Sequence, residues 1–97
     1  MPMKWQTMML NIMEKIEMVI DKTIEYRGQT FDRTHGSPFD RGSADSYYSR
    51  PEDPHWYPEG SYNGDRVESK DMSIAEMRAY FMGYEYNEQF GDKKSWD

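Results

Sequence analysis

Apolar side chains recur at helical spacing in the first third of the chain. Between residues 3 and 27 they lie alternately four and three positions apart, which is the spacing of a heptad seam. Arg27 and Gly28 suit the last turn of a helix and the position just after it. The pattern predicts one long amphipathic helix whose seam is buried within the subunit or across a homodimer. The seam comprises Trp5, Met9, Ile12, Ile16, Val19, Thr23 and Tyr26.

A second helix is predicted near the C-terminus. Ser73 and Glu76 have the spacing of a capping box, in which each side chain caps the backbone of the other residue. Gly83 costs about 1 kcal/mol relative to alanine inside a helix, so we expect another backbone or ring to approach it closely. The helix is expected to end at Gly91, and Trp96 is expected to pack back on the body. Its predicted buried face comprises Ile74, Met77, Phe81 and Tyr84, with Tyr80 beside it.

The stretch from Ser37 to Pro58 has neither helical nor strand periodicity, and it contains four prolines. Proline lacks a backbone N–H, so we expect an ordered segment without regular secondary structure, and at most one helical turn at residues 43–48. Asn63-Gly64 then predicts a tight turn or very short strands. The expected fold is mainly α, with α+β left open. It is a single domain over residues 1–97, divided into residues 1–28, 29–72 and 73–97.

Composition narrows the class of protein. Aromatic residues make up 15% of the chain and compensate for a low hydrophobic share of 36%, so a folded protein is expected. The net charge of -6 disfavours nucleic-acid binding, because phosphate backbones repel an acidic surface. The absence of cysteine excludes disulfides and thiolate zinc sites. No signal peptide or membrane-spanning stretch is recognisable, so a cytoplasmic location without membrane binding is expected.

Catalytic and metal-binding patterns are absent from the sequence. The two histidines, His35 and His55, are 20 positions apart, and no zinc or EF-hand spacing surrounds them. No nucleophile-elbow motif accompanies the serines and aspartates, which suit turn caps better. We therefore expect no enzyme, no cofactor, no metal and no catalytic residue.

The central stretch combines arginines with aromatic rings, the residue types enriched at binding hot spots. Such a set could form a contact patch for a protein, or hold a nucleotide-like ligand by phosphate pairing and ring stacking. The alternative is a structural role, in which Arg41 or Arg50 pairs with a carboxylate of the same stretch and locks it. The candidate carboxylates are Asp40, Asp45, Glu52 and Asp53. The predicted binding residues are Arg41, Tyr47, Tyr48, Arg50, His55 and Trp56.

The block from Pro38 to Tyr48, followed by Arg50-Pro51, Pro54-His55 and Pro58, resembles a family of small uncharacterised bacteriophage and prophage proteins. The glycine-rich turn at residues 60–64, the pair Gly83-Tyr84 and the end Lys94-Ser95-Trp96 also resemble that family. The resemblance covers roughly residues 37–97. It implies a phage setting and assigns no chemistry.

Three functional hypotheses remain open from the sequence. The first is a phage accessory protein that binds and modulates a host protein, such as a defence component, without catalysis. The second is a protein that binds or sequesters a small nucleotide-like ligand. The third is a structural virion or assembly component that uses the predicted N-terminal helix, which would also form the homodimer.

Overall fold

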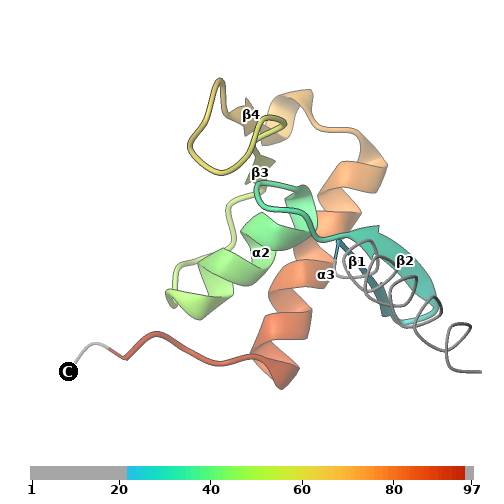
Figure 1. Cartoon of the computed structure of the whole chain (residues 1–97), viewed down its shortest axis with the longest axis vertical. Coiled ribbons are helices and arrows are strands. Elements are labelled where there is room, and N and C mark those ends of the chain that lie inside the picture. Colours follow the sequence, from blue (N-terminus) through green and yellow to red (C-terminus); the bar gives the residue numbers. More distant parts are fainter. Residues whose placement is uncertain (1–21, 96–97) are drawn as a thin grey trace, which may run out of the picture.

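The computed structural model describes residues 22–95 and shows a small α+β fold. In this part of the chain, two α-helices cross near the centre, and two two-stranded antiparallel sheets lie around them (Figure 1). The expectation of a mainly α fold is therefore wrong. The elements in order are β1 (Thr23–Tyr26), β2 (Gln29–Asp32), α2 (Pro38–Tyr47), β3 (His55–Trp56), β4 (Val67–Glu68), a 3-10 turn (Ser69–Asp71) and α3 (Ile74–Phe90).

The predicted N-terminal helix is wrong over residues 23–27, which belong to a β-hairpin. Strand β1 pairs with β2, and Thr23 lies opposite Asp32. Arg27 and Gly28 join the strands with φ of 53° and 76°, the left-handed backbone that a two-residue hairpin turn requires. A glycine at residue 28 suits this turn as well as a helix end, so it did not distinguish the two structures. The remainder of the predicted helix and its seam lies outside the described residues.

The central stretch contains the regular helix α2, which corrects the prediction of an irregular segment. Ser37 is its N-cap, since the Ser37 hydroxyl accepts a hydrogen bond from the Asp40 N–H at 3.2 Å. Pro38 occupies the first turn, where its missing N–H costs nothing. The buried stripe of α2 does follow helical spacing, but half of its residues are polar, so a search for apolar periodicity misses it. The stripe comprises Pro38, Phe39, Arg41, Gly42, Asp45 and Ser46.

Helices α2 and α3 touch backbone to backbone through two glycines. A β-carbon on Gly42 would lie 2.0 Å from the Tyr80 carbonyl oxygen, and one on Gly83 would lie 2.0 Å from the Phe39 carbonyl oxygen. The Ser43 hydroxyl donates to the Gly83 carbonyl at 3.0 Å across the same contact. The expected close approach at Gly83 is confirmed, and it sets the crossing of the two helices.

The predicted C-terminal helix is confirmed in extent and in its cap. Ser73 and Glu76 form both hydrogen bonds of the capping box, and α3 ends before Gly91. The predicted buried face is wrong at its first position. Ile74 is 87% exposed, whereas Tyr80 has no exposed surface. The helix is therefore buried at its middle, where it crosses α2, and Trp96 lies outside the described residues.

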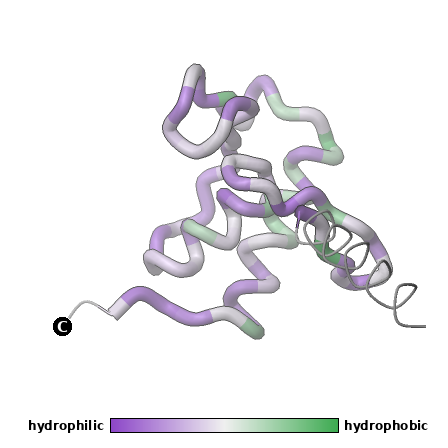
Figure 2. The backbone as a smooth tube through the Cα atoms, in the orientation of Figure 1, coloured by the Kyte–Doolittle hydropathy of each residue, from purple (hydrophilic) through white to green (hydrophobic). Residues whose placement is uncertain are grey.

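Contacts between a few aromatic rings take the place of a large apolar core. Phe31 of β2 stacks on Phe39 of α2 with ring centroids 5.4 Å apart, and both side chains are buried. Hydrophilic stretches run through every part of the fold, including its centre (Figure 2). Residues around Asn63-Gly64 form a loop, and β4 pairs with β3 rather than with a strand ending at Tyr62. No helix within residues 22–95 is long and apolar enough to cross a membrane.

Candidate functional site

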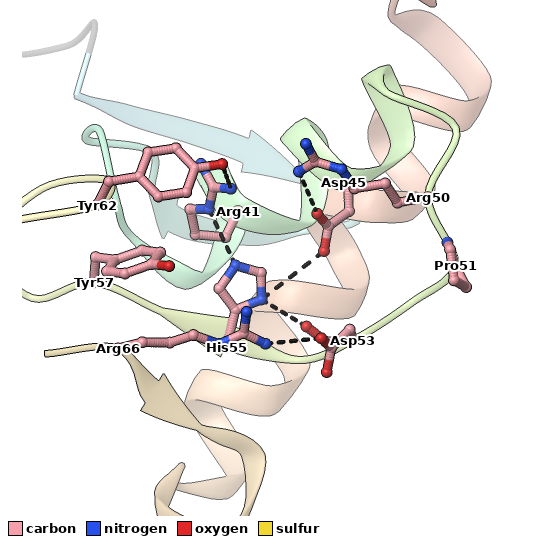
Figure 3. Close-up of a pocket in the computed structure, with 9 residues that line it drawn as sticks. All are labelled: Arg41, Asp45, Arg50, Pro51, Asp53, His55, Tyr57, Tyr62 and Arg66. Atoms are coloured by element: carbon pink, nitrogen blue, oxygen red, sulfur yellow. Dashed lines mark hydrogen bonds and ion pairs between the residues drawn. The ribbon is translucent and has the colours of Figure 1, made fainter.

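A cavity of about 390 Å³ lies where α2, β3 and the loop between β3 and β4 meet. All of its lining residues come from one stretch of chain, residues 41–66, and Figure 3 shows Arg41 between Tyr62 and His55. Helix α3 contacts this stretch through Tyr80, whose hydroxyl forms hydrogen bonds with Asp45 and Asp53. The lining residues are Arg41, Asp45, Arg50, Pro51, Asp53, His55, Tyr57, Tyr62 and Arg66.

Arg41 lies on the buried stripe of α2, and its side chain reaches into the cavity. Only 5% of the residue is exposed. Its guanidinium donates to His55 Nε2 at 3.2 Å, to Ser61 Oγ at 3.1 Å and to Tyr62 Oη at 3.1 Å. The rings of Tyr57 and Tyr62 lie 5.6 and 4.9 Å from its central carbon. Arg41 is therefore fixed by neutral acceptors and aromatic rings.

The positive charge of Arg41 has no direct counter-charge. No carboxylate of residues 22–95 forms an ion pair with its guanidinium, and its hydrogen bonds reach Asp40 only through the Ser61 hydroxyl, at 3.5 Å. Burying a charge without an opposite charge is unfavourable, and the aromatic rings offset only part of that cost. An anion entering the cavity would supply the missing partner.

His55 is oriented by hydrogen bonds on both ring nitrogens. Its Nδ1 lies 2.6 Å from the Asp53 carbonyl oxygen, and its Nε2 faces the Arg41 Nε–H at 3.2 Å. Since Arg41 can only donate, Nε2 must accept, and the proton must sit on Nδ1, where it donates to the carbonyl. The arrangement therefore holds the neutral imidazole, and His55 acts here as a support for Arg41.

Asp45 and Tyr80 form the buried wall behind the cavity. Tyr80 of α3 donates to Asp45 Oδ2 at 2.5 Å, and its oxygen accepts from the Asp53 N–H at 2.8 Å. Burial, followed by the hydrogen bond to the Asp45 carboxylate, raises the pKa of the Tyr80 phenol far above its ordinary value. Tyr80 therefore stays neutral and ties α2, α3 and the start of β3 together.

Two further arginines stand at the rim and differ in their partners. Arg66 pairs with Asp53 at 2.7 Å and with Glu68 at 3.1 Å, so two carboxylates neutralise it. Within residues 22–95, Arg50 forms an ion pair only with Asp45, at a long 3.5 Å. Its guanidinium also interacts with the Tyr62 hydroxyl, and 47% of its side chain is exposed. Arg50 is therefore the rim group whose charge is most available to a ligand.

The cavity is positive within an acidic protein. Its lining holds three arginines and two aspartates, which leaves one positive charge when His55 is neutral, whereas the whole chain has a net charge of -6. Arginines that face a cavity favour ligands that carry carboxylate or phosphate groups.

Three of the six predicted binding residues lie together at this cavity, namely Arg41, Arg50 and His55. The other three lie outside its lining. The Tyr48 ring lies under the Arg50 guanidinium at 4.7 Å, and the Tyr47 ring contacts Tyr48 at 5.0 Å. Trp56 follows His55 in β3, and successive strand residues point to opposite faces, so its ring points away from the cavity.

The predicted ion pairs are present in part. Arg50 does pair with Asp45, but Arg41 pairs with none of the proposed carboxylates. Tyr57, Tyr62 and Arg66 were not predicted as site residues. The Asn63-Gly64 turn was a usable signal, because a tight reversal there returns Tyr62 and Arg66 toward the preceding stretch. Nothing in the sequence indicated which way their side chains would point.

No protein-family model, curated protein or solved structure matches the chain. Within residues 22–95, no group of three or more histidine, aspartate or glutamate side chains is placed to hold a metal ion.

Proposed function

We propose that the cavity binds a small phosphorylated ligand, of the class of a nucleoside monophosphate, and that the protein acts by binding and sequestering it. The observation that carries this proposal is the buried guanidinium of Arg41, which has three neutral hydrogen-bond partners and forms no ion pair with any residue from 22 to 95. A phosphate group would pair with Arg41 and with the nearby exposed Arg50. Arginine–phosphate hydrogen bonds are about twice as strong as those between neutral groups.

The size and lining of the cavity support the same class of ligand. Its volume of about 390 Å³ lies in the range of small-molecule sites, roughly 300–1,000 Å³. Tyr57 and Tyr62 line it beside the arginines and offer aromatic surface to a planar ring. Stacking of a base on an aromatic side chain contributes about 1–3 kcal/mol.

The hypothesis of a phage accessory protein that binds a host protein stays a prediction, as does the structural role in a virion. An acidic segment of a partner protein would also be attracted to the cavity. The depth of Arg41 favours a compact anion instead, because a flat protein surface does not reach a residue that is only 5% exposed.

Calorimetric titration of the full chain at low salt tests the proposal, with inorganic phosphate and adenosine monophosphate as probes. Both should bind at one saturable site, and the nucleotide should bind more tightly. Arg50→Ala should weaken binding about tenfold or more, because a hydrogen bond to a charged group contributes about 1.5–3 kcal/mol.

Arg33→Ala is the matched control, since Arg33 is exposed and lies outside the cavity. It should leave the affinity unchanged. Absence of saturable binding by the wild-type chain, or equal losses in the two variants, would show that Arg41 has only a structural role.

A further inference from the structure

Tyr62 has an unusual backbone for a bulky residue. Its φ is 65°, in the left-handed region, and its neighbours Gly60 and Gly64 have φ of 100° and 67°. Glycine adopts this region freely, but a side chain with a β-carbon is strained there. Such strain persists where surrounding contacts compensate for it, and it concentrates at ligand clamps and switches.

The contacts that compensate for this strain all lie at the cavity. The Tyr62 ring lies 4.9 Å from the Arg41 central carbon and 5.3 Å from the Tyr57 ring centroid, and its hydroxyl accepts from Arg41 Nη2 at 3.1 Å (Figure 3). The residue is nevertheless 66% exposed. Tyr62 therefore contacts the rest of the protein through Arg41, Arg50 and the Tyr57 ring, and water reaches most of its surface.

The phenolic oxygen of Tyr62 interacts with the guanidinium groups of Arg50 and Arg41. The nearby guanidinium groups of Arg50 and Arg41 hold the pKa of the Tyr62 phenol below its ordinary value, because they favour the charged form. Both arginines line the cavity in which a phosphate would bind. The Tyr62 hydroxyl oxygen thus already accepts a hydrogen bond from Arg41 Nη2, a donor that the proposed ligand would need.

We propose that Tyr62 is an internal competitor of the ligand, and that a phosphate oxygen displaces the Tyr62 hydroxyl from Arg41 Nη2 when the ligand binds. This inference rests on the proposed function and adds its regulation. Displacement breaks one neutral hydrogen bond, forms a stronger charge-assisted one, and releases Tyr62 from its strained backbone. Because the competing contact lowers the fraction of binding-competent protein, it weakens the apparent affinity by that fraction.

The inference predicts that removing the Tyr62 hydroxyl strengthens ligand binding, whereas removing a group that contacts the ligand weakens it. Tyr62→Phe keeps the ring and removes only the hydroxyl. If the hydroxyl competes with the ligand, the variant should bind adenosine monophosphate and inorganic phosphate about two- to tenfold more tightly, which is the contribution of one net hydrogen bond. If Tyr62 holds the ligand through its hydroxyl, the variant should bind more weakly.

Calorimetric titration of the full-length wild type and Tyr62→Phe measures this difference. Tyr86→Phe is the control, because Tyr86 lies on α3 away from the cavity and should leave the affinity unchanged. A circular-dichroism melt of each variant checks that the fold is intact. In the wild type, ring-labelled tyrosine should show a shift of the Tyr62 resonances toward those of free tyrosine on saturation with phosphate.

The outcomes separate this inference from the proposed function. Wild-type binding with an equal or weaker affinity in Tyr62→Phe overturns the competition by Tyr62 and leaves the proposed function standing. Absence of binding in both proteins overturns both.

Discussion

Helix α2 is the more polar of the two helices and yet the more buried, whereas α3 is the more apolar and the more exposed. Six of the ten residues of α2 are buried, although its buried stripe includes an arginine, an aspartate and a serine. Only two of the 17 residues of α3 are buried, although α3 contains most of the apolar side chains of the two helices. Ile74 and Phe90, near its ends, are exposed.

The difference shows that burial in this protein follows backbone contact and hydrogen bonding more than hydrophobicity. Gly42 and Gly83 let the helices touch, and the polar side chains of α2 find partners at that contact. Ser46, which is fully buried, donates to the Glu88 carboxylate at 2.6 Å and accepts from the Asn87 amide at 2.9 Å. Buried polar groups are tolerated where they are hydrogen-bonded in this way.

The largest effect is expected from separating the helices. Gly83→Ala would place a β-carbon 2.0 Å from the Phe39 carbonyl oxygen, which is backbone and cannot move aside. We expect a loss of about 3 kcal/mol or more in the free energy of unfolding, at the upper end for overpacking. Urea denaturation measures the loss.

Gly28→Ala is the comparison variant, because its β-carbon would meet nothing within 4 Å and its φ of 76° alone is unfavourable. It should lose about 1–2 kcal/mol. Equal losses at the two glycines would mean that the helices can move apart at little cost.

A smaller loss is expected from breaking one polar link between the helices. Tyr80→Phe removes the hydroxyl that donates to Asp45 and accepts from the Asp53 N–H. Oδ2 of the buried Asp45 then loses its hydrogen-bond donor, and we expect a loss of about 2–3 kcal/mol at neutral pH. A phenylalanine variant as stable as the wild type would contradict the role assigned to this link.

The same residue should give the protein a dependence on alkaline pH. The pKa of Tyr80 is raised in the folded protein, so its contribution is fully present below the unfolded tyrosine value of about 10 and decreases as pH rises above it. Denaturation curves of the wild type should therefore lose stability above pH 10, and those of Tyr80→Phe should change less. A parallel fall in both proteins would assign the effect to other groups.

The smallest effect is expected at the most apolar exposed position. Ile74 is 87% exposed on the first turn of α3, so Ile74→Ser should change the unfolding free energy by no more than about 0.5 kcal/mol. A loss well above that value would mean that Ile74 is covered in solution. Measuring the molar mass of both proteins would then show whether a second copy covers it.

Local signals in the sequence determined the helix α3, its start at Ser73 and the close contact at Gly83. They did so because a capping box and a glycine act within a few residues. The arginines and histidine of the central stretch led to the prediction that Arg41, Arg50 and His55 are binding residues, and these three line one cavity. The sequence did not distinguish a helix end from a hairpin turn at Arg27-Gly28, because both accept a left-handed glycine.

Only the tertiary structure decided that α2 is a buried helix and that Arg41 is its central polar residue. The arginine, glycine, aspartate and serine of its buried stripe give no apolar signal, and their burial becomes favourable only when α3 supplies close backbone contact and hydrogen-bond partners. The meeting of Tyr62 with Arg41, which are 21 residues apart, likewise depends on the course of the intervening chain. Apolar periodicity in a sequence indicates which hydrophobic residues are buried. It does not indicate which polar residues can be buried, because that depends on hydrogen-bond partners from distant parts of the chain.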